Sequence, residues 1–209
     1  MSRAAAASIL VPSDPSLLGR LRADSARAAP RPVESLLLLL DGSSSMDGGP
    51  WTALRAAVRS LAGASSPSRC HMAVAIWACQ ADVVLPFTPD MQAVADGMPG
   101  RPPGGSTAMR EALEMAGGLT WPTSIRRVVL LSDGVPTTGD PVPAARRLGR
   151  DGTTIDTVAC GPHGDVVLRA VAAAGGGRHV RCSDVSELAG AFRSLETGVR
   201  GLLGAAHPA

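Results

Sequence analysis

Five consecutive leucines, Leu36–Leu40, end directly at an acidic residue, Asp41. An unbroken apolar run of this length, closed by Gly42 and three serines, is typical of a strand buried on both faces of a parallel sheet. Open sheets of that class bind their ligands in the crevice beyond the carboxyl ends of the strands. The run therefore predicts a buried strand that carries a polar site at its end.

The rest of the chain alternates strand-like and helix-like segments, which indicates a doubly wound sheet. Only Cys79-Gln80-Ala81 joins the second and third strands, and this link is too short for a parallel crossover, so the third strand is predicted to be antiparallel. Pro86 places it at an edge. The predicted fold class is α/β: a Rossmann-like, doubly wound, mostly parallel six-stranded sheet with one antiparallel edge strand and helices on both faces. The predicted strands are 35–40, 71–78, 82–85, 126–131, 153–159 and 178–181.

Helices are expected between these strands, each with an apolar stripe that faces the sheet. Ser106 is predicted to be the N-cap of the helix that runs to Gly117. Ser183 or Asp184 is predicted to cap the last helix, in which Leu188 and Phe192 lie on the apolar stripe. The remaining predicted helices are 50–62, 89–98, 143–149 and 165–174.

Composition divides the chain into three predicted parts. Residues 1–30 are rich in Ala, Ser, Arg and Pro and form an N-terminal extension, in which a short helix over 16–26 and a partly mobile segment both remain open. Residues 31–203 form one domain, which is the default for a chain of 209 residues. Residues 204–209 form a C-terminal tail.

The charge and aromatic content exclude several classes of function. The net charge is only +2, so neither a nucleic acid nor a membrane surface is expected as a partner. All 20 basic residues are arginines, which excludes a P-loop and Schiff-base chemistry, because both require a lysine. With no tyrosine and two phenylalanines, the chain lacks the aromatic platforms on which single-stranded nucleic acids stack.

The cysteines and the amino terminus indicate a cytoplasmic protein. None of the four cysteines forms a C-x-x-C pair, and reduced thiols are predicted. Cys160 and Cys182 both fall near strand ends, which leaves a disulfide between them as the alternative. The first residues lack the apolar core of a signal peptide, and no run is long enough to span a membrane.

Oxygen-bearing side chains gather at the ends of two predicted strands. Asp41, Ser43 and Ser45 form a D-x-S-x-S motif after the first strand, and Asp133 follows the fourth. Because these strands are predicted to be neighbours where the strand order reverses, Asp41 and Asp133 are expected in one crevice. Thr107 lies on a separate Gly-Gly-Ser-Thr loop and is expected to reach the same place once the sheet folds. Hydroxyl and carboxylate oxygens suit Mg²⁺ or Mn²⁺.

The D-x-S-x-S motif, the distal threonine and the distal aspartate together resemble the metal-ion-dependent adhesion site of von Willebrand factor A domains, the family that includes integrin inserted domains. The resemblance covers residues 31–200. It implies that Ser43, Ser45 and Thr107 are direct or near-direct metal ligands, whereas Asp41 and Asp133 act mostly through water. It also implies a non-enzymatic module that binds the Asp or Glu carboxylate of a partner protein. Free-standing bacterial members of the family make an AAA+ ATPase one expected partner.

Two enzymatic interpretations compete with this one. A serine hydrolase would use Ser106 with Asp133 or Asp156 and His163 or His179, but a nucleophile elbow must directly follow a strand, and Ser106 follows a Pro/Gly-rich loop. An aspartyl phosphotransferase with Asp41 as nucleophile generally needs a lysine, which the chain lacks.

Asp47 lies close to the D-x-S-x-S motif and leaves one question open about the site. It is predicted to be a helix-leading acid that interacts favourably with the helix dipole. If it faced the ion instead, it would add negative charge to the site and weaken the preference for a carboxylate partner.

Overall fold

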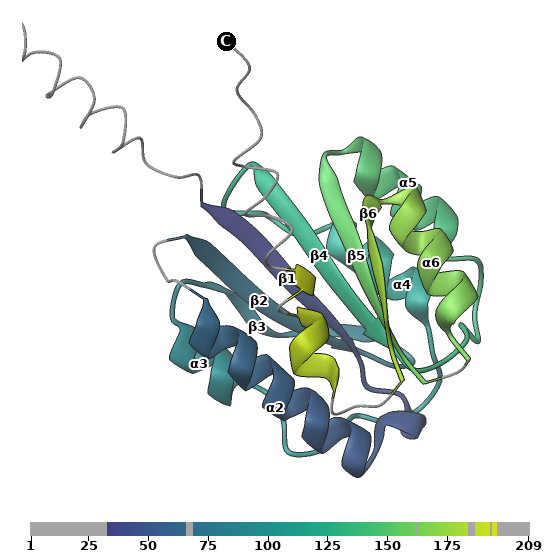
Figure 1. The fold of residues 1–209 in the computed structure, drawn as a ribbon. Helices are drawn as coiled ribbons and strands as arrows, with labels where there is room; N and C mark the ends of the chain where they lie inside the picture. The colour runs from purple at the N-terminus through teal and green to yellow at the C-terminus, as the bar shows by residue number, and fades with distance from the viewer. Residues whose placement is uncertain (1–32, 66–68, 162, 184–186, 193, 196–209) are drawn as a thin grey trace, which may run out of the picture. The chain divides into compact units, whose positions relative to one another are not determined.

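One sheet of six strands organises the protein (Figure 1), and the computed structural model describes residues 33–65, 69–161, 163–183, 187–192 and 194–195 of it. The strands are β1 (Glu34–Asp41), β2 (Cys70–Trp77), β3 (Ala81–Thr88), β4 (Ile125–Ser132), β5 (Thr153–Cys160) and β6 (Gly176–Cys182). Their order is β3-β2-β1-β4-β5-β6. Only the pairing of β2 with β3 is antiparallel among these strands.

Helices cover both faces of this sheet. The described helices are η1 (Ser44–Met46), α2 (Gly49–Ala64), α3 (Met91–Asp96), α4 (Met109–Gly117), α5 (Val142–Arg150) and α6 (Asp165–Ala174), with further helical turns over 187–192. One face packs against α2, α3 and those last turns, and the other packs against α4, α5 and α6 (Figure 1). The predicted fold class is therefore confirmed.

The sheet has a hydrophobic core on each face, and the leucine run of β1 contributes side chains to both. Leu36, Leu38 and Leu40 belong to the core under α2, whereas Leu37 and Leu39 belong to the core under α4. This division follows from the two-residue period of a strand, which turns successive side chains to opposite faces. Four of the five leucines have no exposed surface. The run is continuous because β1 lies between two neighbours and beneath helices on each face.

The topology brings the predicted site residues together at the carboxyl ends of the central strands β1 and β4. β1 pairs in parallel with β2 on one side and with β4 on the other, and the register sets Leu40 beside Leu131. The next residues along the two strands are Asp41 and Ser132, and Asp133 then follows Ser132. The strand order reverses between β1 and β4, and sheets of this class bind ligands beyond the carboxyl ends of the strands at that point.

Two predicted element boundaries differ from the structure, and two further predictions fall outside the described residues. The predicted third strand extends through Pro86 to Thr88, because it pairs with β2 as far as Met72. The prediction that Ser106 is an N-cap is wrong: α4 begins at Met109, and its N-cap residue is Ala108. The predicted helix at 16–26 and the last helix beyond residue 195 lie outside the described residues. None of the described helices is both long and apolar enough to cross a bilayer.

Candidate metal centre

Asp41, the last residue of β1, has a completely buried carboxylate. Its Oδ1 accepts a hydrogen bond from the backbone N–H of Ser43 at 2.8 Å, and its Oδ2 accepts one from the Ser132 hydroxyl. Burial raises the pKa of the Asp41 carboxyl; these hydrogen bonds oppose the increase, and the nearby charge of Asp133 adds to it. A cation beside this group would favour the ionised carboxylate.

Ser43 and Ser45 connect Asp41 to Asp133: the backbone N–H of Ser43 binds Asp41, and the two serine hydroxyls lead on to Asp133. The hydroxyl oxygens of Ser43 and Ser45 lie 3.0 Å apart, and Ser45 donates to Oδ1 of Asp133 at 2.9 Å. A serine hydroxyl has a single proton, and Ser45 uses its proton for Asp133. In the bond between the two serines, Ser43 is therefore the donor. The short turn of η1 follows Ser43, and Ser45 lies within it. Four of the five predicted site residues thus form one hydrogen-bonded set across the ends of β1 and β4.

The loop that precedes α4 is attached to the D-x-S-x-S turn by backbone contacts. Gly104 N–H donates to the carbonyl of Gly42 at 2.9 Å, and Gly105 N–H donates to the Ser44 hydroxyl at 2.9 Å. Ser44 N–H returns a bond to the Gly105 carbonyl at 3.2 Å. Gly104 and Gly105 have φ values of 75° and 108°, which side chains strongly disfavour. The two glycines therefore allow the close approach of the two loops.

Thr107 lies beside Thr137 and Gly134 in the segment that follows β4. Its backbone N–H donates to the Thr137 hydroxyl at 2.9 Å, and its carbonyl accepts from Thr137 N–H at 3.0 Å. Its Oγ1 lies 3.9 Å from the position that a Cβ atom would take on Gly134. Thr107 is mostly buried beside the residue that follows Asp133. The structure therefore places the fifth predicted residue against the loop at the end of β4.

The donor chemistry of this arrangement fits a hard divalent cation. The five predicted residues offer only hydroxyl and carboxylate oxygens, and such oxygens suit Mg²⁺ and Mn²⁺. Nowhere in the described part of the chain do three or more His, Cys, Asp or Glu side chains group in a way that could hold a metal. Any ion at this edge would therefore rely on hydroxyl groups and two carboxylates.

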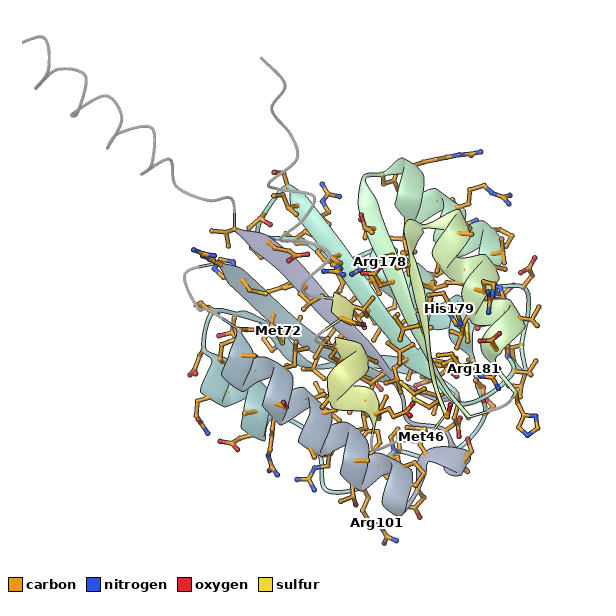
Figure 2. The ribbon with its side chains drawn as sticks, in the orientation of Figure 1. Met46, Met72, Arg101, Arg178, His179 and Arg181 are labelled. Carbon is orange, nitrogen blue, oxygen red and sulfur yellow. The ribbon has the colours of Figure 1, made fainter. Side chains whose placement is uncertain are left out.

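Asp47 does not join the hydrogen-bonded set. Its Oδ1 accepts from the Gly48 N–H at 2.9 Å, and its Oδ2 lies 3.8 Å from Nη2 of Arg101. Arg101 is highly exposed and projects from the lower edge of the molecule in Figure 2, where Met46 is also labelled. The contacts of Asp47 thus agree with its predicted position at the start of a helix.

The residues of the hydrolase interpretation have other partners. The Ser106 hydroxyl donates to the sulfur of Cys79 at 3.3 Å. Asp156 binds Arg127, and His179 binds Thr157 and Asp165. None of the hydrogen bonds between described residues connects Ser106 to a histidine or an aspartate. The structure therefore does not assemble the alternative set of Ser106, Asp133 or Asp156, and His163 or His179.

Three supporting residues were not identified from the sequence as parts of the site. Ser132 binds the Asp41 carboxylate, Ser44 binds the glycine loop, and Thr137 holds the backbone of Thr107. The position of Ser132 could have been found by aligning the ends of the neighbouring strands 35–40 and 126–131. Thr137 lies in an irregular segment with no comparable signal.

Comparison with known proteins identifies the architecture. Residues 36–135 match the family model described as von Willebrand factor type A domain. The conserved hypothetical protein BatB from Bacteroides thetaiotaomicron is similar at 17% identity and a TM-score of 0.72, over 82% of this chain and 100% of that chain. The vWF domain of the type V pili tip protein Mfa5 from Porphyromonas gingivalis is similar at 14% identity and a TM-score of 0.70, over 87% and 99%.

A third similar structure contains a metal. Proximal thread matrix protein 1 from the mussel byssus, described with a zinc-occupied MIDAS motif, has 18% identity and a TM-score of 0.68, over 80% of this chain and 46% of that chain. At these identities, the structural similarities establish the fold alone. None of the curated proteins compared with this chain matches it.

Proposed function

The chain contains a von Willebrand factor type A domain, and we propose that this domain is a divalent-metal-dependent module that binds an acidic side chain of a partner protein. Domains of this family are protein-interaction modules with metal sites. The proposed ligand set is Asp41, Ser43, Ser45, Thr107 and Asp133. The observation that carries the proposal is the hydrogen-bonded connection from Asp41 through Ser43 and Ser45 to Asp133.

We favour Mg²⁺ or Mn²⁺ as the ion in this chain. The zinc in the mussel protein supports a divalent cation at the corresponding motif. Zinc sites in proteins usually draw on sulfur and nitrogen ligands, whereas the set proposed here has only oxygens. Hard cations are therefore the better match to these residues.

The surface of the site agrees with recognition of a partner carboxylate. Ser45 is exposed and Asp133 is partly exposed, so a side chain from outside can approach them, whereas Asp41 and Ser43 are buried beneath. A bound divalent ion that is not fully neutralised by the protein would supply an electrophilic position for a carboxylate. Buried Asp41 would then orient the serines and balance charge without meeting the partner.

We further propose that the protein is a cytoplasmic adaptor in a multi-protein system. It rests on the family resemblance, by which an AAA+ ATPase is one class of partner. A pull-down from cells with and without a chelator tests this part, because the proposal expects the captured partner to depend on the divalent ion. An ATPase that binds equally in both conditions would contradict it.

Metal titration of two matched variants tests the site. We expect calorimetry to detect Mg²⁺ or Mn²⁺ binding to the wild-type chain, with an affinity that Asp41→Asn reduces roughly 10- to 100-fold. Asp47→Asn is the control, because Asp47 is a nearby carboxylate that binds Gly48 and faces Arg101. Its affinity should equal that of the wild type. The absence of ion binding by a folded wild-type protein would refute the proposal.

A further inference from the structure

Cys160 and Cys182 lie side by side at the carboxyl ends of β5 and β6. They are direct partners in the parallel register of the two strands. Neighbouring strands are separated by about 4.8 Å, and the Cα atoms of disulfide-bonded cysteines are usually about 4.4–6.8 Å apart. The backbone therefore holds these residues at a separation that a disulfide can bridge without a large rearrangement.

The two side chains also lie on the same face of the sheet. Both residues are buried in the core under α2. The interaction between the two thiols lowers the pKa of Cys182, whereas the same interaction and burial raise the pKa of Cys160. Cys182 is thus the better nucleophile of the two, because the thiolate is the reactive form.

We propose that Cys160 and Cys182 are a redox pair that closes into a disulfide when the protein meets hydrogen peroxide. The Cys182 thiolate attacks one peroxide oxygen, the O–O bond breaks, and the product is a sulfenic acid and, after protonation, one water. The Cys160 sulfur then attacks the Cys182 sulfur, forms the S–S bond, and releases the second water. Two thiols lose two protons and two electrons, and peroxide is reduced to two waters. A dithiol reductant reverses the reaction.

The pair and the proposed metal site both lie at the carboxyl ends of strands of the same sheet. The charges of Asp133 and Asp41 contribute to the raised pKa of Cys160. A Cβ on Gly164, in the loop that follows β5, would lie 2.7 Å from the carbonyl oxygen of Gly134, next to Asp133. The end of β5 is also paired with the end of β4, where Ala159 lies beside Ser132, so a bond between Cys160 and Cys182 would constrain a strand that neighbours the site. This regulatory consequence rests on the proposed function, whereas the cross-link itself does not.

Thiol mapping of the full chain tests the redox pair. After peroxide treatment, unfolding and alkylation, we expect neither Cys160 nor Cys182 to be alkylated, and we expect a cross-linked peptide that contains both. Dithiothreitol should restore both sites. Cys79→Ser, which removes an exposed thiol outside the pair, should leave the cross-link unchanged, and Cys182→Ser should abolish it.

The same mapping can overturn the proposal. Full alkylation of Cys160 and Cys182 after treatment, or oxidation that stops at sulfinic acid without a cross-link, would do so. If Cys182→Ser fails to fold, the wild-type and Cys79→Ser proteins still decide the outcome.

A Mn²⁺ titration tests the link to the site. We expect at least a threefold difference in Mn²⁺ affinity between the oxidised and reduced proteins, and equal affinities would overturn the link while the cross-link stands. If the reduced protein binds no metal at all, the proposed function fails, and thiol mapping alone judges the redox pair.

Discussion

The hydroxyl of Ser132 donates a hydrogen bond to the buried carboxylate of Asp41 across the ends of β4 and β1. This contact crosses the point where the strand order reverses, and it holds a carboxyl group that has no contact with solvent. A buried carboxylate that loses a donor pays the cost of desolvation without compensation.

Ser132→Ala should therefore destabilise the protein at neutral pH. We expect a loss of about 1–3 kcal/mol, which is typical of a buried polar group left without its hydrogen-bond partner. Urea unfolding measures it. Ser106→Ala is the control, because its hydroxyl binds Cys79 in an exposed position, and it should change stability by about 0.5 kcal/mol or less. Equal stability of Ser132→Ala and the wild type would show that the contact contributes nothing.

The contact between the two loops of the site depends on the absence of a side chain at residue 42. A Cβ on Gly42 would lie 2.7 Å from Ile76 and 2.7 Å from Pro103. Gly42→Ala should cost about 1–3 kcal/mol, as overpacking commonly does. Gly49→Ala is a matched control, because its Cβ would meet nothing within 4 Å. Thermal unfolding should separate the two variants, and equal midpoints would contradict the prediction.

Arg127 is buried in an ion pair with Asp156, and its Nη2 also donates to the carbonyl of Leu195 at 2.9 Å. Arg127→Met would leave Asp156 buried without its cation, and the expected loss is about 3–5 kcal/mol. Arg126→Met, at the partly exposed neighbouring position, should have a much smaller effect. Guanidinium unfolding measures both. Similar losses for the two variants would indicate that the ion pair is not the cause.

The network around His179, labelled in Figure 2, predicts a pH dependence of stability. His179 and Arg169 lower the pKa of the Asp165 carboxyl in the folded protein. A carboxyl with a depressed pKa in the folded state stabilises the protein above its unfolded pKa of about 3.9 and loses that contribution as pH falls further. Asp165→Asn should therefore be less stable than the wild type at pH 7.

The difference between Asp165→Asn and the wild type should shrink as pH falls from about 5 to 3. Urea midpoints measured at several pH values in this window test it, provided that both proteins remain folded without denaturant. Curves that stay parallel across the window would exclude a contribution from Asp165.

Local patterns predicted most of the sheet. The leucine run identified β1 because a continuous apolar segment has few alternatives to a strand buried on both faces. The link Cys79-Gln80-Ala81 correctly predicted the antiparallel edge, since a short link cannot cross over. The full length of β3 could not be predicted, because hydrogen bonds to β2 extend it through Pro86, where local propensity ends a strand.

In the site too, sequence spacing identified some of the residues, whereas other contacts are visible only in the structure. Sequence spacing led to Asp41, Ser43, Ser45 and Asp133, and the structure brings these four into one hydrogen-bonded set. Ser106 was assigned to a helix cap because serine prefers that position. In the structure, its hydroxyl turns to Cys79 on the loop after β2, a contact that no local rule encodes.

By itself, the sequence determined the layered α/β architecture and the strand ends at which oxygen ligands gather, because burial and periodicity act over a few neighbouring residues. Only the tertiary structure decided that Ser132 supports Asp41, that Thr137 holds Thr107, and that Cys160 meets Cys182. Each of these contacts joins separate segments through register or loop packing, and its geometry is set when the whole sheet closes.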